Sequence, residues 1–274
     1  MKKLLICFLS IAILSCSNDN DGDNSNGTLI KSSKKYVEGA LDEETTYEYN
    51  NQGNISKITT VSNSETTVIT FNYDGNGIMT GFVEETDDVF DNMTVETDVF
   101  TYTNLMVSTI CLDLQNLTNE NIPHYVDKIE YVYNGLGQPE QIKHYFGEDA
   151  EFNTCDDVND LQFSEFMEYD ANGNMIYYLN DNDGFFGPNY YTYTYDNNSH
   201  PFSNIEPVVF NKLFGFSTVN NIASAIEYNA NNDEQTATIS YEYEYNDNGY
   251  PTNLVRVYQA GGFSQTLTFE YSYY

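Results

Sequence analysis

The chain has few cations and no tryptophan. Lysine and arginine together number 10 against 42 acids, which gives a formal net charge of −32 over 274 residues. A nucleic-acid-binding protein needs a basic patch that neutralises phosphates, but here the cations are scattered and Arg256 is the single arginine. The sequence therefore predicts no nucleic-acid partner. Tryptophan often forms the stacking platform of sugar sites, so carbohydrate binding is less favoured, although tyrosine can take its place.

Motifs for catalysis and metal binding are also missing. The three histidines, His124, His144 and His200, lack metal-ligand spacing with another histidine or a cysteine. There is no nucleophile elbow, Walker loop or dinucleotide fingerprint. We therefore predict no metal, no cofactor and no catalytic residue, and not an enzyme. The many carboxylates leave a glycosidase-like pair open, so a glycoside-acting enzyme remains the third hypothesis for the function.

Beyond its N-terminus the chain has no apolar run long enough to be a transmembrane helix. The N-terminal run begins with Lys2 and Lys3 and is shorter than the roughly 20 residues that span a bilayer. It is typical of a secretory signal peptide, residues 1–15. It ends in "ILSC", which resembles a bacterial lipobox. That resemblance implies cleavage before Cys16 and a lipid (palmitate) on Cys16, so the protein is anchored to a membrane through its N-terminal lipid.

Residues 16–35 are predicted to form a flexible, acidic tether, because "SNDNDGDNSNGT" is polar and contains glycine. Ser17 argues against retention at the inner membrane. The acids resemble the surface-export signal of Bacteroidetes-type lipoproteins, which implies the outer membrane and its extracellular face. Asp19, Asp21 and Asp23 alternate as in a calcium loop, but the glycine and glutamate that an EF-hand loop requires further on are absent.

Aromatic residues recur as a repeat in the remaining chain, residues 36–274. Each unit alternates aromatic and polar residues, as in Tyr241, Tyr243 and Tyr245 around two glutamates, which is the pattern of a strand with one packed face and one wet face. The intervals between units are typical of repeat architectures. The tyrosines that set the register are Tyr49, Tyr73, Tyr102, Tyr133, Tyr169, Tyr195, Tyr245 and Tyr271.

A turn signal follows most of these tyrosines. Asp74 with Gly77 and Asp170 with Gly173 have the spacing of a type I turn, in which the Asx side chain caps the first position. Gly77, Gly173 and Gly249 would take the left-handed position of a G1 bulge. A second strand leaves each turn, so each unit is a β-hairpin and successive units form a meander.

The motif Tyr-x-Tyr-Asp-x-x-Gly-Asn resembles the YD repeat of Rhs-type proteins. Together with the lipobox and the stretch "YDNNSHPFSNI", it resembles small Bacteroidetes-type YD-repeat lipoproteins, a domain family of unknown function. The resemblance implies a porin-like β fold and no particular activity. Rhs proteins close a cocoon from many more repeats and carry a toxin tail, and this chain has neither.

We therefore predict a single all-β domain, an antiparallel β-meander of about 14 strands. It would curl into a twisted sheet or a soluble, barrel-like form whose aromatic face is the core. A membrane-spanning barrel, suggested by the terminal Tyr274, is disfavoured because Glu270 and Ser272 share the outward phase of that strand.

The tight turns should lie on one edge of the meander and the long connections, residues 104–127, 147–163 and 180–188, on the other. Cys111 and Cys155 fall in two neighbouring connections of that edge, in an oxidising compartment. This placement favours a disulfide, with free buried thiols as the alternative. Residues 201–220 break the alternation, carry many apolar side chains and allow a short helix from Pro207. They would form a core plug or, alternatively, a lid over a ligand cavity.

These observations lead to an expected function. The leading hypothesis is a surface lipoprotein acting as a binding or interaction module for an unknown protein or glycan, because loops on a rigid scaffold usually carry binding. The alternative is a lipoprotein carrier of an apolar or lipid-like ligand inside the curled sheet, gated by residues 201–220.

Overall fold

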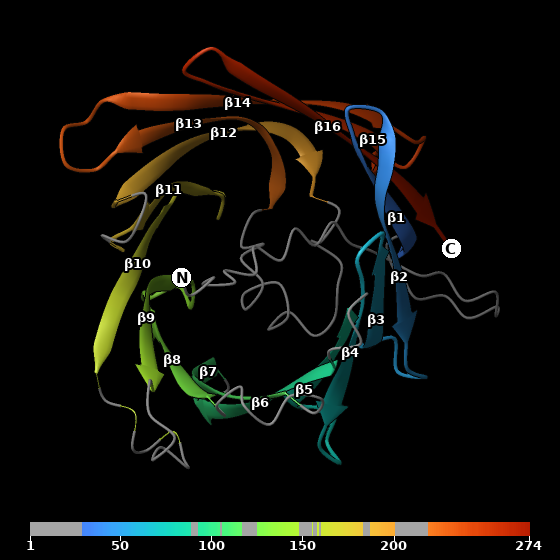
Figure 1. Ribbon diagram of the computed structural model, residues 1–274, viewed down its shortest axis with the longest axis vertical. Coiled ribbons are helices and arrows are strands. Elements are labelled where there is room, and N and C mark those ends of the chain that lie inside the picture. The colour runs from blue at the N-terminus through green and yellow to red at the C-terminus, as the bar shows by residue number, and fades with distance from the viewer. Residues whose placement is uncertain are drawn as a thin grey trace.

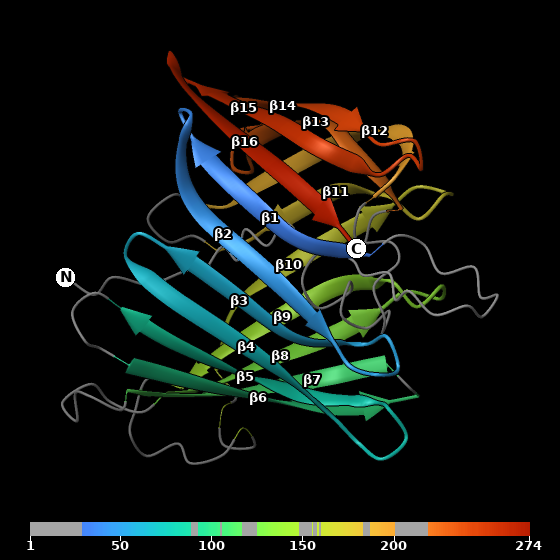
Figure 2. The same cartoon turned by 90° about the vertical axis from the view of Figure 1, so that its right-hand side faces the viewer.

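The chain forms one closed antiparallel β-barrel (Figures 1 and 2). The computed structural model describes residues 29–88, 93–104, 106–116, 125–147, 155, 158, 160–182, 187–200 and 219–274. Within these ranges the structure consists of strands and their connections, with no α-helix. The strands are β1 (Ile30–Val37), β2 (Ala40–Tyr49), β3 (Ile55–Ser62), β4 (Glu65–Tyr73), β5 (Met79–Asp88), β6 (Met93–Thr103), β7 (Met106–Asn116), β8 (Tyr125–Tyr133), β9 (Pro139–Gly147), β10 (Leu161–Tyr169), β11 (Met175–Asn180), β12 (Asn189–Ser199), β13 (Asn220–Asn229), β14 (Gln235–Tyr245), β15 (Pro251–Ala260) and β16 (Phe263–Tyr273).

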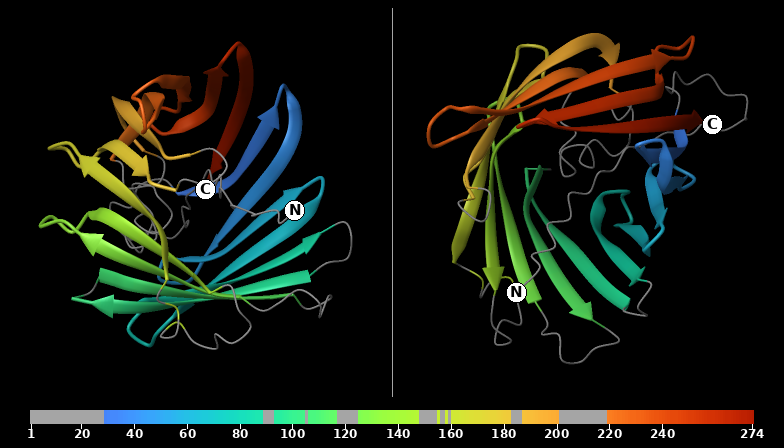
Figure 3. Two further views of the ribbon diagram at one scale, coloured as in Figure 1. Left: turned by 60° about the vertical axis from the view of Figure 1, so that its left-hand side comes forward. Right: turned by 45° about the horizontal axis from the view of Figure 1, so that its top comes forward.

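Every strand pairs with its neighbours in sequence, and β1 pairs with β16 to close the barrel. Figure 3 shows the sheet curving round on itself from two further directions. The predicted all-β antiparallel meander in a single domain is confirmed. Of the two forms left open, a curled sheet and a barrel, the chain adopts the barrel, and a closed barrel has no exposed sheet edge.

The strand count is 16 rather than about 14, for two reasons that can be located. β1 begins at Ile30, within the stretch predicted as tether, because it pairs with the distant β16 and carries little of the aromatic alternation. β7 lies inside the predicted loop 104–127. Its buried phase is aliphatic, with Val107 and Ile110, so a register based on tyrosine passes over it.

The turns have the predicted chemistry. Oδ1 of Asp170 accepts the backbone N–H groups of Asn172 and Asn174, at 2.8 and 2.9 Å, and the N–H of Gly173 donates to the backbone oxygen of Asp170 at 3.1 Å. Asp74 and Gly77 repeat this arrangement. The φ angles of Gly77, Gly173 and Gly249 are +81°, +92° and +79°, which confirms their left-handed role.

Tyrosines at the ends of five strands donate to a backbone oxygen of the preceding strand and so link successive hairpins. Tyr73 donates its hydroxyl to the backbone oxygen of Ile55 at 2.5 Å, and Tyr133 donates to that of Val107 at 2.7 Å. These bonds explain why tyrosine rather than phenylalanine recurs before the turn. The equivalent pairs are Tyr102 with Met79, Tyr195 with Met175 and Tyr273 with Pro251.

The two faces of the wall differ in character. Asp98 is 2% exposed and its neighbour Val99 is 55% exposed, so alternate residues point to the packed interior and to the outside. The outer face carries ion pairs between strands, including Lys34 with Glu44 at 3.4 Å. Large buried side chains of the inner face form one cluster: Ile30, Tyr47, Ile55, Ile58, Ile69, Phe71, Met79, Phe82, Phe100, Val107 and Ile110.

Several predicted features lie outside the described residues. These are the signal peptide, Cys16, most of the tether, and residues 201–218 of the predicted plug or lid. The two ends of that segment are close together, because the backbone N–H of His200 donates to the oxygen of Val219 at 2.9 Å. In the described ranges, no helix is long and apolar enough to cross a membrane.

Candidate binding surface on the inner wall and its open rim

The hairpin connections lie on two rims of the barrel, as predicted. The tight Asx–Gly turns between β2 and β3, β4 and β5, β8 and β9, β10 and β11, and β14 and β15 all lie on one rim, called here the turn rim. The connections after the odd-numbered strands lie on the opposite rim, called here the open rim. β1 starts at the turn rim beside the chain end, where Ile30 pairs with Tyr273 (Figure 2). The N-terminal segment therefore leaves the barrel at the turn rim.

A pocket lies on the inner wall near the open rim. It has a volume of about 260 Å³ and is lined by Arg256, Tyr258, Phe263, Gln265 and Leu267 of the β15–β16 hairpin. The register explains the grouping, because Arg256 pairs with Leu267 and Tyr258 pairs with Gln265, which places all four on one face. The pocket thus combines a cation, two aromatic rings and an amide.

Arg256 is held by its neighbours without a carboxylate. It pairs with Tyr241 of β14 and bonds to the phenol of that residue. Burial raises the pKa of Tyr241, and the charge of Arg256 opposes that rise. The Nε atom of Arg256 is buried and has no hydrogen-bond partner among the described residues. In the same part of the chain, no Asp or Glu lies within ion-pair distance of the guanidinium.

Glu227 of β13 is the carboxylate next to this group on the inner face, and neutral donors hold it. Its Oε1 accepts the side-chain amide of Asn189 at 3.1 Å, and its Oε2 lies 3.5 Å from the hydroxyl of Tyr258. Burial raises the pKa of Tyr258, and the charge of Glu227 raises it further. Glu227 is therefore held by neutral donors and does not form an ion pair with Arg256.

A group of acids occupies the opposite part of the wall. Glu84 of β5 pairs directly with Glu96 of β6, and Asp98 follows two residues later on the same face. Burial raises the pKa of all three carboxyls, and their mutual repulsion adds to the rise in Glu96 and Asp98. Oδ2 of Asp98 is buried without a hydrogen-bond partner. No cluster of His, Cys, Asp or Glu within the described ranges is arranged to hold a metal ion.

Gly81 explains how β5 and β6 come so close at this acidic group. A Cβ atom at Gly81 would lie 1.9 Å from the backbone oxygen of Asp98, and the φ angle of Gly81 is +153°. Only glycine allows this approach between the two backbones. The close contact helps to bury Asp98 against its neighbour strand.

The histidines have structural surroundings. Nε2 of His144 lies 3.1 Å from Oε1 of Glu165, and its ring stacks on Phe163 with centroids 4.2 Å apart. His200 is buried, and burial lowers its pKa to about 3. His124 lies outside the described residues. Neither described histidine belongs to a group of three or more His, Cys, Asp or Glu side chains among the described residues that could hold a metal ion.

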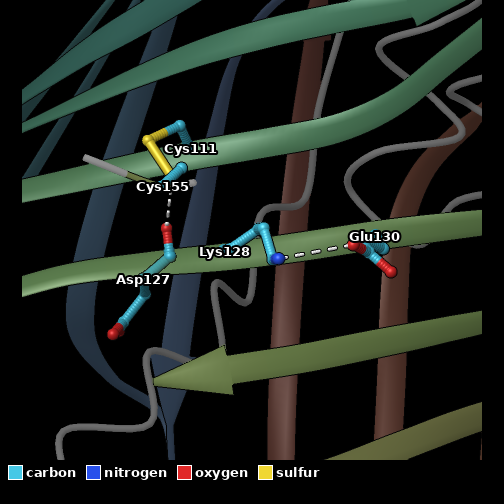
Figure 4. The surroundings of a disulfide bond; sticks show 5 residues. All are labelled: Cys111, Asp127, Lys128, Glu130 and Cys155. Atoms are coloured by element: carbon cyan, nitrogen blue, oxygen red, sulfur yellow. Dashed lines mark hydrogen bonds and ion pairs between the residues drawn. A yellow bond between two sulfur atoms is a disulfide. The ribbon is translucent and has the colours of Figure 1, made fainter. Parts of the chain in front are cut away.

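Cys111 and Cys155 form the predicted disulfide, with their Cα atoms 5.7 Å apart (Figure 4). The placement of Cys111 corrects the prediction, because it lies in the middle of β7 and not in a connection. It is on the outer face, between Val99 of β6 and Lys128 of β8. Sγ of Cys155 lies 3.3 Å from the backbone oxygen of Asp127. The bond therefore fixes the β9–β10 connection against the outside of the wall.

The alternation in the sequence places the charged residues of the inner wall on the apolar phase of their strands. In β6, Glu96 and Asp98 share the phase of Phe100 and Tyr102, and in β15 Arg256 shares the phase of Leu254 and Tyr258. A charge on the apolar phase of a strand is the signal that identifies an interior charge.

Comparison with solved structures identifies the fold. A porin-like protein from Bacteroides uniformis is 15% identical and has a TM-score of 0.53, over 89% of this chain and 96% of that one. A second porin-like protein, from Bacteroides vulgatus, is 12% identical with a TM-score of 0.42, over 89% and 98%. The Photorhabdus luminescens Tc holotoxin is 11% identical with a TM-score of 0.26, and the chain covers 13% of it.

The porin-like β fold implied by the sequence resemblance is thus confirmed. No protein-family model matches the chain, and no curated protein is similar to it at a significant level.

Proposed function

We propose that this protein is a YD-repeat lipoprotein, anchored in the outer membrane through Cys16, whose barrel is a binding module facing outward from the cell. The observation that carries this proposal is the arrangement of the two rims. The tether joins β1 at the turn rim. The connections β7–β8, β9–β10 and β11–β12 and the Arg256 pocket lie at the open rim, whereas the connection between β12 and β13 lies at the turn rim. A barrel anchored by its turn rim presents the open rim away from the membrane.

The outer wall supports a body held on a tether rather than one embedded in lipid. Lipid-facing strands carry a continuous apolar band. Here Lys57 of β3 and Glu48 of β2 form an ion pair at 3.6 Å on the outside of the barrel, and Tyr36 of β1 donates to Glu270 of β16 at 2.9 Å. Lys34 of β1 and Glu44 of β2 form another such pair at mid-strand, so charged groups interrupt any such band.

The surface location is tested by protease shaving of intact cells that express the full chain. Loss of the barrel from intact cells, with a periplasmic control protein retained, is the expected result. A variant with Cys16→Ala should leave the membrane fraction, because it lacks the acceptor for the lipid. Full protection of the anchored protein on intact cells, with digestion only after lysis, would contradict the outward-facing orientation.

Partners are sought with the same chain. The Cys16→Ala form is immobilised through a C-terminal tag and exposed to a glycan array and to proteins of the host environment. Binding should be lost when the open rim is blocked by a bulky label, for example on a Gly262→Cys variant in the β15–β16 turn. A label on a Gly135→Cys variant at the turn rim serves as the matched control. Equal loss with both labels would argue against an open-rim site.

The second candidate function is a carrier for an apolar or lipid-like ligand. It is favoured by the inner wall, where aromatic side chains line much of the face, including Tyr178 beside Tyr191 at a centroid distance of 6.2 Å. The test is extraction of the purified protein with organic solvent and mass spectrometry of the extract. A stoichiometric lipid would favour the carrier, whereas an empty extract together with an open-rim partner would favour the binding module.

A further inference from the structure

The only arginine of the chain stands on the inner wall in an unusual electrostatic setting. The protein has 42 acids and a net charge of −32, so a surface cation has many possible partners. Arg256 nevertheless lies inside, in contact with the phenol of Tyr241, and makes no ion pair with a described carboxylate. Such a placement is costly unless an anion completes it, because a desolvated charge needs a counter-charge or strong hydrogen bonds.

The guanidinium has a donor to spare. Its Nε–H is buried and donates to none of the described residues. A carboxylate that enters the pocket can meet Nε and one terminal nitrogen together when the side chain rotates to present both. That paired geometry is the one in which arginine recognises carboxylates, and lysine cannot reproduce it.

The rest of the pocket fits a ring attached to that anion. Tyr258 and Phe263 supply two aromatic faces, and Leu267 adds an apolar side. Gln265 brings an amide that can both donate and accept a hydrogen bond. Phe263 is 59% exposed at the tip of the hairpin, so a ligand would bury it. The volume of about 260 Å³ suits one ring with its substituents and excludes a large ligand.

We propose that the Arg256 pocket binds a ring compound that bears a carboxylate, held by the guanidinium and packed between Tyr258, Phe263 and Leu267. The proposal rests on the binding function proposed above and names the ligand chemistry for it. Two sources share this chemistry, an acidic sugar and an aromatic acid. The measurement below separates the two.

The experiment is a ligand-observed NMR titration of the full Cys16→Ala chain with two matched pairs of probes. The first pair is glucuronate and glucose, which differ in the carboxylate. The second pair is benzoate and benzyl alcohol, which differ in the same way on an aromatic ring. We expect one acid of the two pairs to bind and its neutral partner to bind at least about tenfold more weakly, because charge-assisted bonds to arginine are lost.

Variants locate the binding. Arg256→Gln should weaken the binding of that acid at least about tenfold, and Arg256→Lys should fall between it and the parent, because the charge remains without the planar fork. Phe263→Ala should weaken it a few-fold. Lys34→Gln, a cation change on the outer face, is the matched control and should leave it unchanged. Thermal unfolding of each variant shows that the barrel is intact.

Three outcomes would overturn the proposal: neither acid binds, an acid binds no better than its neutral partner, or its binding survives Arg256→Gln unchanged. These outcomes leave the outward-facing location untouched, since that is read by protease shaving. Conversely, if the barrel lies on the periplasmic side and the acid still binds in an Arg256-dependent manner, the proposed location is refuted and the proposed ligand site stands. Because Phe263 is exposed and remote from the barrel core, its variant retains the test even if substitutions at Arg256 unfold the protein.

Discussion

The barrel has two walls built from the same repeat and filled with different chemistry. The wall from β2 to β9 buries aliphatic side chains and phenylalanines, and the ring centroids of Phe71 and Phe82 lie 5.8 Å apart. The same wall carries the acids Glu84, Glu96 and Asp98. The inner face of the wall from β10 through β16 carries half-buried tyrosines, among them Tyr178, Tyr191 and Tyr243, and it carries Arg256. Turns and inter-hairpin tyrosine bonds occur in both walls. The repeat therefore specifies the barrel, and the inner positions outside the repeat specify what each wall can bind.

The two walls also differ in the charged residues on their inner faces. Glu84, Glu96 and Asp98 repel one another on the first wall, while Arg256 on the second bonds to Tyr241 and makes no ion pair with a described carboxylate. Neither group neutralises the other. A buried charge without a partner weakens a fold, so both walls hold polar groups that packing alone would not select.

The most damaging single change is expected on the first wall, at Gly81. Gly81→Ala would place a Cβ atom 1.9 Å from the backbone oxygen of Asp98 and force β5 from β6, so we expect a loss of at least about 3 kcal/mol in the free energy of unfolding. Gly249→Ala, in a turn of the second wall, keeps its φ of +79° but meets no atom, and should lose only about 1 kcal/mol.

Urea denaturation of the two variants measures this contrast. Equal losses would show that β5 and β6 separate without cost, and that the close approach at Asp98 contributes nothing to the first wall.

The disulfide belongs to the first wall alone, and its removal is the next largest effect. Cys111→Ser combined with Cys155→Ser removes a cross-link between residues 44 apart in sequence. We expect the free energy of unfolding to fall by about 2 to 4 kcal/mol. Reduction of the parent with dithiothreitol should lower its melting temperature as far as the double substitution does. A melting temperature that is insensitive to reductant, with the bond shown open by thiol titration, would contradict a stabilising role.

The acidic group should make the first wall sensitive to pH. Because the pKa of Asp98 is higher in the folded protein than in the unfolded chain, its contribution is fully present below the ordinary carboxyl range, about pH 3.9, and is lost as the pH rises through the elevated value. Asp98→Asn should therefore match the parent at low pH and exceed it at pH 9, by on the order of 1 kcal/mol or more.

Denaturation curves between about pH 3.5 and pH 9 give the comparison. Asp87→Asn, an exposed change on the outer face of the neighbouring strand β5, is the control and should follow the parent at every pH. Parallel curves for Asp98→Asn and the parent would mean that the carboxyl is ionised in the folded state.

The smallest expected effects come from the tyrosine bonds to backbone oxygens, which occur in both walls. Tyr73→Phe and Tyr195→Phe each remove one bond to a backbone oxygen, in the first and the second wall, and each should lose about 1 kcal/mol. Tyr36→Phe removes an exposed bond to Glu270 and should lose less than about 0.5 kcal/mol. Losses confined to one wall would show that the tyrosine bonds do not belong to the repeat as a whole.

The repeat was readable from the sequence because its chemistry is local. The Asp170–Gly173 turn needs a particular residue at each position within one short stretch, and the structure has the predicted bonds. Closure of the barrel was not readable in the same way, because the pairing of β1 with β16 depends on residues at opposite ends of the chain. The start of β1 and the place of β7 were missed for want of aromatic alternation.

The candidate site was only partly predictable. The open rim followed from the order of the hairpins, and the disulfide from the two cysteines that remain after Cys16. The Arg256 pocket needed the register between β15 and β16, which brings Arg256 and Tyr258 opposite Leu267 and Gln265. Sequence alone places each residue on a phase but does not say how strands align.

The seam between β1 and β16 has a consequence for the order of folding. All other neighbours in the barrel are consecutive strands, whereas Tyr36 of β1 meets Glu270 of β16 across 234 residues of chain. Consecutive hairpins can form one after another during synthesis, but β1 can pair with β16 only after β16 has been synthesised. The first strand of the barrel is therefore the last to find its full set of partners. A chain cut short before β16 would leave two unpaired edges open to aggregation.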